Sequence, residues 1–135
     1  MSLLKIFDVA GSSMSAQSVR LNTTASNLAN ANTAAGSKAE AYRARHPVFQ
    51  TIMDDATDAS AGVRVSDITT SDAEPTKVHQ PGHPKADADG YIYQSNVSPV
   101  DELVNMISAS RSYQNSVEVM NTSKELLLRT LRLGQ

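Results

Sequence analysis

The chain begins and ends with a long segment in which apolar residues recur every three or four positions. The first segment, from about Ser2 to Asn32, contains no proline and a single glycine, Gly11. The second runs from about Ser98 to Leu133 with the same spacing. This spacing places apolar side chains along one stripe of an α-helix. We therefore expect a mainly α fold, with two long terminal helices in an antiparallel, coiled-coil-like pair and a small β-rich or loop insert between them.

We expect the two apolar stripes to form the assembly seam, the surface through which the helices pack against each other and against neighbouring chains. Gln17 and Thr24 interrupt the first stripe with polar side chains, and Ser110 and Lys124 interrupt the second. The residues expected to carry the packing are Leu3, Phe7, Met14, Leu21, Leu28, Leu103, Met106, Tyr113, Val117, Met120, Leu127 and Leu131.

The second helix has clear start and stop signals. Ser98 can cap the helix, and Pro99 fits its first position. Asp101 and Glu102 then lie in the first turn, where negative charge is favourable. Gly134 follows the last apolar residue and favours termination.

Proline and glycine concentrate in the middle of the chain. We expect three segments: an N-terminal helix over 1–34, an outer insert over 35–97, and a C-terminal helix over 98–135. The two helices are expected to form the inner part of a larger structure. Within the insert, the small acidic stretch 54–62 predicts a loop.

Short strands and tight turns are expected inside the insert. Residues 63–68 predict a strand, with residues 76–80 as its partner across the turn at 74–75. Gln80-Pro81-Gly82 fits a type II turn, because Pro is favoured at its second position and Gly at its third. Asp89-Gly90 predicts another turn before an aromatic strand.

Composition excludes several classes of function. The net charge of -2 argues against nucleic-acid binding, which needs a surplus of basic residues. The chain has no cysteine, which excludes disulfides, thiolate catalysis and cysteine-based zinc sites. No apolar run is long enough to span a membrane, and the N-terminal residues do not resemble a secretory signal.

The residues offer no catalytic, cofactor-binding or metal site. His79 and His83 have the i, i+4 spacing of a helical zinc site, but the residues between and beside them, Pro81, Gly82 and Pro84, forbid a helix. The run Asp87-Ala88-Asp89-Gly90 fails the calcium-loop pattern, because that pattern needs an acid at position 85 and a glutamate at 96. Motifs of nucleophilic hydrolases, nucleotide-binding loops and dinucleotide folds do not occur.

The terminal helices are too poor in large side chains to be stable alone. Aromatic residues make up 4% of the chain, and Ala, Ser, Thr and Asn together number 52. Such thin stripes favour helices that become ordered by packing into a larger assembly. Polar residues beside the stripes are then expected to form lateral hydrogen bonds with neighbouring chains, and we select Asn27, Asn30, Arg111 and Gln114 for this role.

Both ends and the middle resemble one protein family. Residues 25–33 (ASNLANANT) with Tyr42-Arg43 resemble the N-terminal signature of bacterial flagellar rod and hook proteins, and residues 106–115 (MISASRSYQN) resemble their C-terminal signature. Residues 81–87 (PGHPKAD) narrow the resemblance to the C-type branch of the proximal rod proteins.

The resemblance implies a structural subunit of the proximal rod in the flagellar basal body. Its partners would be copies of itself, other rod proteins, the inner-membrane ring and rod-base adaptor proteins. It would pass through the type III export apparatus without a cleaved signal peptide and lie in the periplasmic rod, a hollow helical tube that transmits motor torque. No cofactor is implied.

Three alternatives remain open at this stage. One is another axial protein, either a B-type proximal or a distal rod subunit, although distal rod and hook proteins carry longer middles. A second is a soluble helical adaptor or calcium-responsive module. A hydrolase is the third, and it lacks a recognisable nucleophile.

Overall fold

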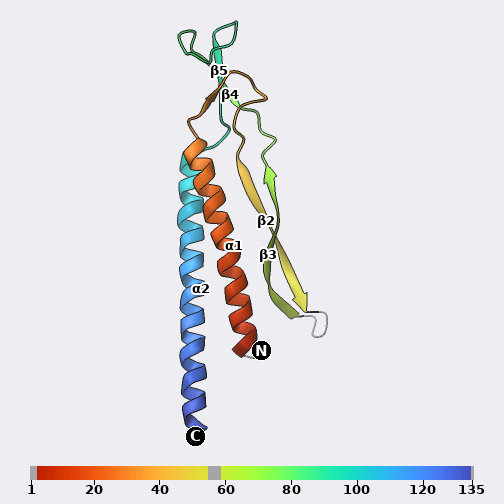
Figure 1. Ribbon diagram of the computed structural model, residues 1–135, viewed down its shortest axis with the longest axis vertical. Coiled ribbons are helices and arrows are strands. Elements are labelled where there is room, and N and C mark those ends of the chain that lie inside the picture. Colours follow the sequence, from red (N-terminus) through yellow and green to blue (C-terminus); the bar gives the residue numbers. More distant parts are fainter. Residues whose placement is uncertain (1–2, 55–58, 135) are drawn as a thin grey trace. The chain divides into compact units, whose positions relative to one another are not determined.

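In the part of the chain that the structure describes, a long helix precedes five strands and a second long helix follows them. The structure, a computed structural model, describes residues 3–54 and 59–134, without the side chains of residues 3, 54 and 59–61. The elements are α1 (Leu3–Asn30), β1 (Ala34–Ala35), β2 (Arg45–Asp54), β3 (Ala59–Thr70), β4 (Thr76–His79), β5 (Tyr91–Gln94) and α2 (Pro99–Leu133) (Figure 1). The expectation of terminal helices around a β-containing middle is confirmed.

The signals at both ends of α2 act as the sequence predicts. The backbone N–H of Asp101 donates to Ser98 Oγ at 3.5 Å, and that of Glu102 donates to the Ser98 carbonyl at 3.0 Å. At the other end, the N–H of Gly134 donates to the Leu131 carbonyl at 3.3 Å. These bonds supply partners for backbone groups that the helix itself leaves unpaired.

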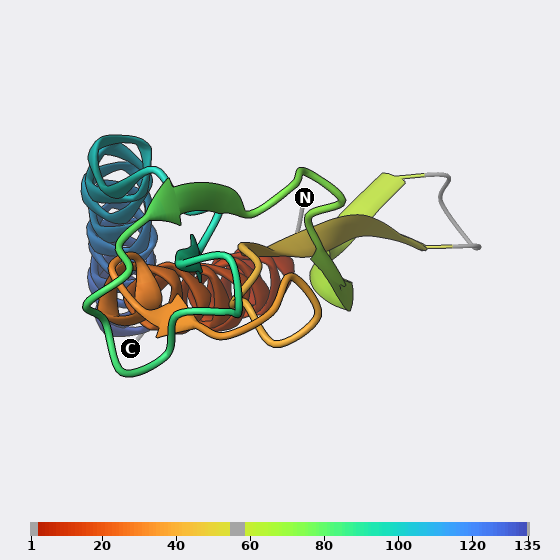
Figure 2. The same ribbon diagram turned by 90° about the horizontal axis from the view of Figure 1, so that it is seen from above.

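The strands form two separate sheets. The first has the order β1-β5-β4, all antiparallel, with Ala34 opposite Gln94 and Val78 opposite Ile92. The second is a ribbon of β2 and β3, which lie side by side in Figures 1 and 2.

The expected pairing of residues 63–68 with residues 76–80 is therefore wrong. The ribbon strand β3 pairs with β2, which precedes it directly in the chain, and β4 pairs with β5. Strand β2 was not predicted, because its apolar residues come in adjacent pairs, Val48-Phe49 and Ile52-Met53, rather than in alternation. Strands that are adjacent in the chain tend to pair with each other. Residues 63–68 of β3 therefore pair with β2 rather than with residues 76–80.

One expected turn and one expected loop need correction. The His83 N–H donates to the Gln80 carbonyl and closes a turn, but Gly82 lacks the positive φ that a type II turn requires. Gly90 has φ +80° in the turn at 87–90, as expected of Asp-Gly. The predicted loop over 54–62 is shorter than expected, because β2 reaches Asp54 and β3 begins at Ala59; residues 55–58 lie outside the described residues.

The chain divides into two compact units. The first contains α1 as far as Leu21, the ribbon residues 47–67, and α2 from Ile107 onward. The second contains residues 22–46 and 68–106. Its core is a cluster of Ala31, Ala44 and Val97 with the partly buried Tyr42, while Ile92 on β5 is 1% exposed.

Candidate assembly surfaces

In the first unit, α1 and α2 approach each other through small residues. The hydroxyls of Ser13 and Ser116 are hydrogen-bonded at 3.0 Å. A Cβ added to Gly11 would lie 3.9 Å from the end of the Met120 side chain. Ala10 on α1 and Ala109 on α2 are buried. Short side chains at these positions allow the two backbones to come close, which a hydroxyl–hydroxyl bond across the helices requires.

The most deeply buried positions of the helices stand one residue before several expected seam positions. Asn27, Glu102, Ala109 and Ser123 are 0–5% exposed, and they precede Leu28, Leu103, Ser110 and Lys124. One residue along a helix turns the side chain by about 100°. On α2 the buried face is therefore rotated from the predicted stripe, whereas on α1 Thr24, which lies on the stripe itself, is 4% exposed. Small and polar residues, rather than leucines, occupy these buried positions.

Most of the expected seam residues therefore lie beside the buried positions of the helices, and their side chains are only partly covered. Leu103 and Leu131 are 47% and 60% exposed. The side chain of Leu3 lies outside the described residues. The others are partly buried: Phe7, Met14, Leu21, Leu28, Met106, Tyr113, Val117, Met120 and Leu127.

Asn27 forms a buried hydrogen-bonding centre in the second unit. Its Nδ2 donates to the Arg45 carbonyl at 2.8 Å, and its Oδ1 accepts from the Arg45 N–H at 2.9 Å. The Tyr42 hydroxyl also donates to Oδ1 at 2.9 Å. The amide thereby pairs with Arg45 as a neighbouring strand would, and satisfies polar groups in a site that is 0% exposed.

This placement differs from the lateral role expected of Asn27, because its amide is committed within its own chain. Asn30, by contrast, lines an open hollow of about 610 Å³ together with Thr33, Tyr42 and Lys85. Its Nδ2 donates to the Ser26 carbonyl at 2.8 Å. The side chains of Arg111 and Gln114 are exposed on α2.

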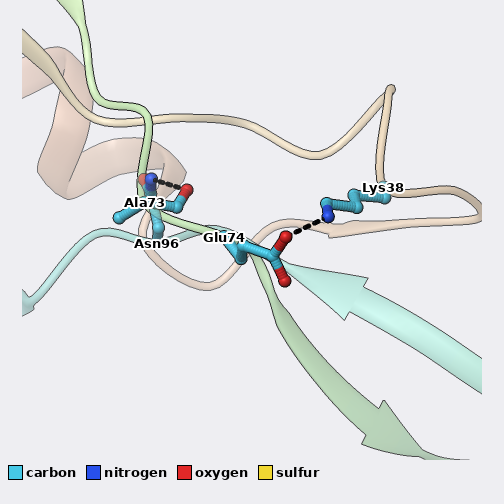
Figure 3. A network of polar contacts seen from close by, with 4 residues as sticks. All are labelled: Lys38, Ala73, Glu74 and Asn96. Atoms are coloured by element: carbon cyan, nitrogen blue, oxygen red, sulfur yellow. Dashed lines mark hydrogen bonds and ion pairs between the residues drawn. The ribbon is translucent and has the colours of Figure 1, made fainter.

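Asn96, which lies between β5 and α2, also bonds to the segment at the start of β2. Its Oδ1 accepts from the Ala44 N–H at 2.7 Å, and its Nδ2 donates to the Ala73 carbonyl at 2.8 Å. Figure 3 shows the bond to Ala73 near the ion pair of Lys38 with Glu74. The Ala44 carbonyl accepts from the Ser71 N–H at 2.8 Å. Asn27 and Asn96 therefore hold the start of β2. This role could not be read from the sequence, because both amides act on residues far away in the chain.

The ribbon meets α1 at a position that requires glycine. The Val63 N–H donates to Ser12 Oγ at 3.1 Å, and the Ser12 hydroxyl donates to the Val9 carbonyl at 2.9 Å. Gly62 has φ +154°, and an added Cβ would lie 2.6 Å from Ser12 Oγ. Only a residue without Cβ permits this approach and this backbone conformation. The isolated glycine within a strand could have indicated such a contact.

Two carboxyl groups have pKa values below their ordinary range. The Tyr91 N–H donates to Asp87 Oδ1 at 2.8 Å and is the main cause that holds the pKa of Asp87 below 3.8. The Asp89 N–H, at 3.0 Å from the same oxygen, acts in the same direction. Lys38 likewise lowers the pKa of the Glu74 carboxyl below 4.5 by its hydrogen bond and charge. Glu74 is exposed and Asp87 is partly buried, and the bonds of both carboxyl groups stabilise loops.

The histidines of the insert have structural contacts. His79 lies against Tyr91 with ring centroids 4.8 Å apart. His83 Nδ1 accepts a hydrogen bond from the Lys85 N–H at 3.1 Å. Among the described residues, no three His, Asp or Glu side chains gather in a way that could hold a metal ion. Neither of the described helices combines the length and apolar character needed to cross a membrane.

Two protein-family models match the chain, one near each end. A family model described as "Flagella basal body rod protein" matches residues 7–34. Another, "Flagellar basal body rod FlgEFG protein C-terminal", matches residues 88–133. The first match includes Asn27, and the second includes Asn96 and all of α2.

Relatives that match over their full length show to which family this chain belongs. The flagellar basal-body rod protein FlgC of Yersinia enterocolitica is 53% identical over 135 residues, covering 100% of both chains. The FlgC protein of Salmonella typhimurium is 52% identical over 136 residues with the same coverage. That of Bacillus subtilis is 32% identical over 146 residues and covers 95% of each chain. The chain belongs to the FlgC family of flagellar basal-body rod proteins.

Membership of the FlgC family confirms the resemblance drawn from the terminal signatures and the PGHPKAD segment. The relatives are structural rod proteins rather than enzymes, which confirms the expectation of a structural role. The full-length match favours a FlgC-type subunit over the other axial proteins and over a soluble adaptor.

Proposed function

We propose that this protein is a structural subunit of the proximal rod in the bacterial flagellar basal body. Copies of the chain, together with other rod proteins, build a hollow helical tube that transmits motor torque and leaves a channel for export. Flagellum-dependent motility requires this tube. The observation that carries the proposal is the 53% identity to a FlgC rod protein over the full length of both chains.

The terminal helices are proposed to form an antiparallel, coiled-coil-like pair. Two contacts support this: Ser13 meets Ser116, and Gly11 lies near Met120. The lower number on α1 goes with the higher number on α2, which is the order of an antiparallel pair. In this proposal residues 1–34 and 98–135 form the inner tube, and residues 35–97 lie outside it.

The partly exposed stripe residues are proposed to complete their burial against neighbouring subunits. Leu103 and Leu131 have the greatest exposure among them, and isolated apolar surface of this kind gains about 25 cal/mol for each Å² removed from water. The whole expected seam, from Leu3 to Leu131, belongs to this surface. Asn30, Arg111 and Gln114 are proposed as lateral polar contacts, whereas Asn27 is assigned to folding because both its amide nitrogen and its amide oxygen are bonded within the chain.

We place the subunit in the periplasmic part of the rod, reached through the flagellar type III export apparatus. Its neighbours there would include the inner-membrane ring and the rod-base adaptor proteins. A chain without cysteine folds independently of the redox state of the compartment, which suits export. The predominance of small side chains suits passage in an unfolded form followed by ordering on assembly.

Complementation tests this function. The chain is expressed in a motile bacterium that lacks its own FlgC-type protein. We expect swimming to return and purified basal bodies to contain the chain in their rods. Continued absence of swimming, with the chain expressed and exported, would contradict the proposal.

A further inference from the structure

Gln17 stands on α1 at a position where the apolar stripe calls for an apolar side chain. It follows Met14 by three residues and precedes Leu21 by four. The residue is partly buried, and its amide oxygen, Oε1, is shut off from solvent. Among the residues that the structure describes, none donates a hydrogen bond to this oxygen. A buried acceptor without a donor destabilises the folded state, because it has lost its bonds to water and gained none in return.

Other polar side chains of the same helix have partners. In the first unit, the Ser13 hydroxyl bonds to that of Ser116 at 3.0 Å. The Ser12 hydroxyl accepts from the Val63 N–H at 3.1 Å. In the second unit, both the nitrogen and the oxygen of the Asn27 amide are bonded. The orphaned amide oxygen on the stripe therefore differs from these three side chains, each of which stabilises the contact that it makes.

We infer that Gln17 is a destabilising residue built into the first unit. It lowers the free energy needed to open the packing around residues 14–21 of α1. When this packing opens, Oε1 meets water, which supplies the missing donor, so the open state recovers what the closed state lost. Local opening of this kind occurs in folded proteins without unfolding of the whole chain. The effect of Gln17 is therefore confined to the first unit.

Easier opening of α1 has a use in the proposed export of the chain. Passage through a narrow channel in an unfolded form requires the terminal helices to open first. A lower free energy of opening raises the population of the open state, and the cost of one orphaned acceptor corresponds to an increase of about 5- to 100-fold. Gln17 thereby speeds the entry of the chain into the export apparatus. This last step rests on the proposed function, whereas the local destabilisation does not.

Gln17→Met removes the orphaned oxygen and tests its effect. Methionine has about the length of glutamine and a similar helix propensity, so the substitution changes the acceptor and leaves the helix as it is. Native-state hydrogen exchange of the dilute isolated chain measures the opening. We expect the amides of residues 14–21 to exchange about 5- to 100-fold more slowly than in the unsubstituted chain. The Arg45 amide, which Asn27 holds in the second unit, should keep its rate.

Gln114→Met is the matched control, because it makes the same substitution at an exposed position of α2. It should change the exchange of residues 14–21 by less than about 3-fold. Unchanged exchange of these residues in Gln17→Met would overturn the inference, since the oxygen would then be satisfied in the folded chain. Equal slowing at Arg45 would also overturn it, because the effect would not be local. If Gln17→Met does not fold, Gln17→Leu decides by the same criteria.

The role in export is tested separately from the local destabilisation. Gln17→Met and Gln114→Met are expressed at equal levels in the bacterium used for complementation, and the exported chain is measured at early times. We expect less exported chain for Gln17→Met. Equal export of the two variants, with the slower exchange confirmed, would overturn the role in export. The unsubstituted chain alone tests the rod function by restoring swimming, so failure of this inference and failure of the proposed function are distinguishable.

Discussion

The amide oxygens of Asn27 and Asn96 accept hydrogen bonds from the backbone N–H groups of two successive residues, Arg45 and Ala44, at 2.9 and 2.7 Å. Asn27 stands on α1 and Asn96 lies three residues before the start of α2, so each terminal part of the chain contributes one amide. The carbonyls of Ala44 and Arg45 are also bonded, to Ser71 and to Asn27. All four backbone groups are thus satisfied, and within the second unit Ala44 and Arg45 are bonded to residues that precede and follow them in the chain.

Replacement of Asn27 by alanine should destabilise the second unit. The change removes the buried amide that bonds the N–H and C=O of Arg45, whose bonds are partly buried, and it costs about 1–3 kcal/mol. Urea unfolding of the purified chain measures the change. Asn22→Ala on the exposed side of α1 is the matched control, and should alter the free energy of unfolding by less than about 0.5 kcal/mol. Equal stability of the two variants would contradict the role given to Asn27.

Replacement of Gly62 by alanine should detach the ribbon from α1. The new Cβ would lie 2.6 Å from Ser12 Oγ, and alanine disfavours a φ of +154°. We expect a cost of about 1–3 kcal/mol and faster proteolysis within the ribbon, with loss of amide protection at Val63. Gly82→Ala is the control, because no atom lies within 4 Å of its added Cβ. Unchanged protection of Val63 in Gly62→Ala would show that the contact with Ser12 is unimportant.

The loop that ends at Tyr91 should loosen in acid. The pKa of Asp87 is lowered in the folded chain, chiefly by the Tyr91 N–H, so ionisation of Asp87 stabilises the folded loop. This stabilisation is complete above the ordinary pKa of 3.8 and is lost as the pH falls through the lower folded value. NMR titration of the Tyr91 amide measures it. Asp87→Asn should remove the transition while keeping an acceptor oxygen; a titration midpoint at or above 3.8 in the unsubstituted chain would refute the prediction.

A charge on either apolar stripe should prevent assembly. Leu28→Asp or Leu127→Asp places a carboxylate where neighbouring helices are proposed to exclude water, and an unpaired buried charge is strongly unfavourable. We expect loss of rods and of swimming in the complementation assay. Asn22→Asp introduces the same charge at an exposed position of α1 and should swim. Normal swimming of either leucine variant would show that these positions are not packed in the rod.

The local features of the fold could be predicted because they depend on neighbouring residues. Ser98, Pro99 and Gly134 mark the ends of α2 through capping and termination, which act within one turn. The Asp89-Gly90 turn follows from the freedom of glycine to adopt a positive φ. The family could also be recognised, because its signatures lie in continuous segments.

The long-range features could not be predicted in this way. The partners of Asn27 and Asn96 are separated from them by 18 and 52 positions, and no periodicity reports such bonds. The buried side of the helices was missed because it consists of Ala, Ser, Thr, Asn and Glu102. On α2, the large apolar residues that form the recognisable pattern lie one position further along the chain. The pairing of β2 with β3 was missed because β2 lacks alternation.

Hydrogen exchange tests the central claim, that the terminal helices complete their burial only among neighbouring subunits. Amide protection over residues 107–133 is compared between the isolated chain and purified basal bodies. We predict exchange about 100-fold slower or more in the assembled rod, while the Arg45 amide held by Asn27 is protected in both. Equally slow exchange of residues 107–133 in the dilute isolated chain would contradict the claim.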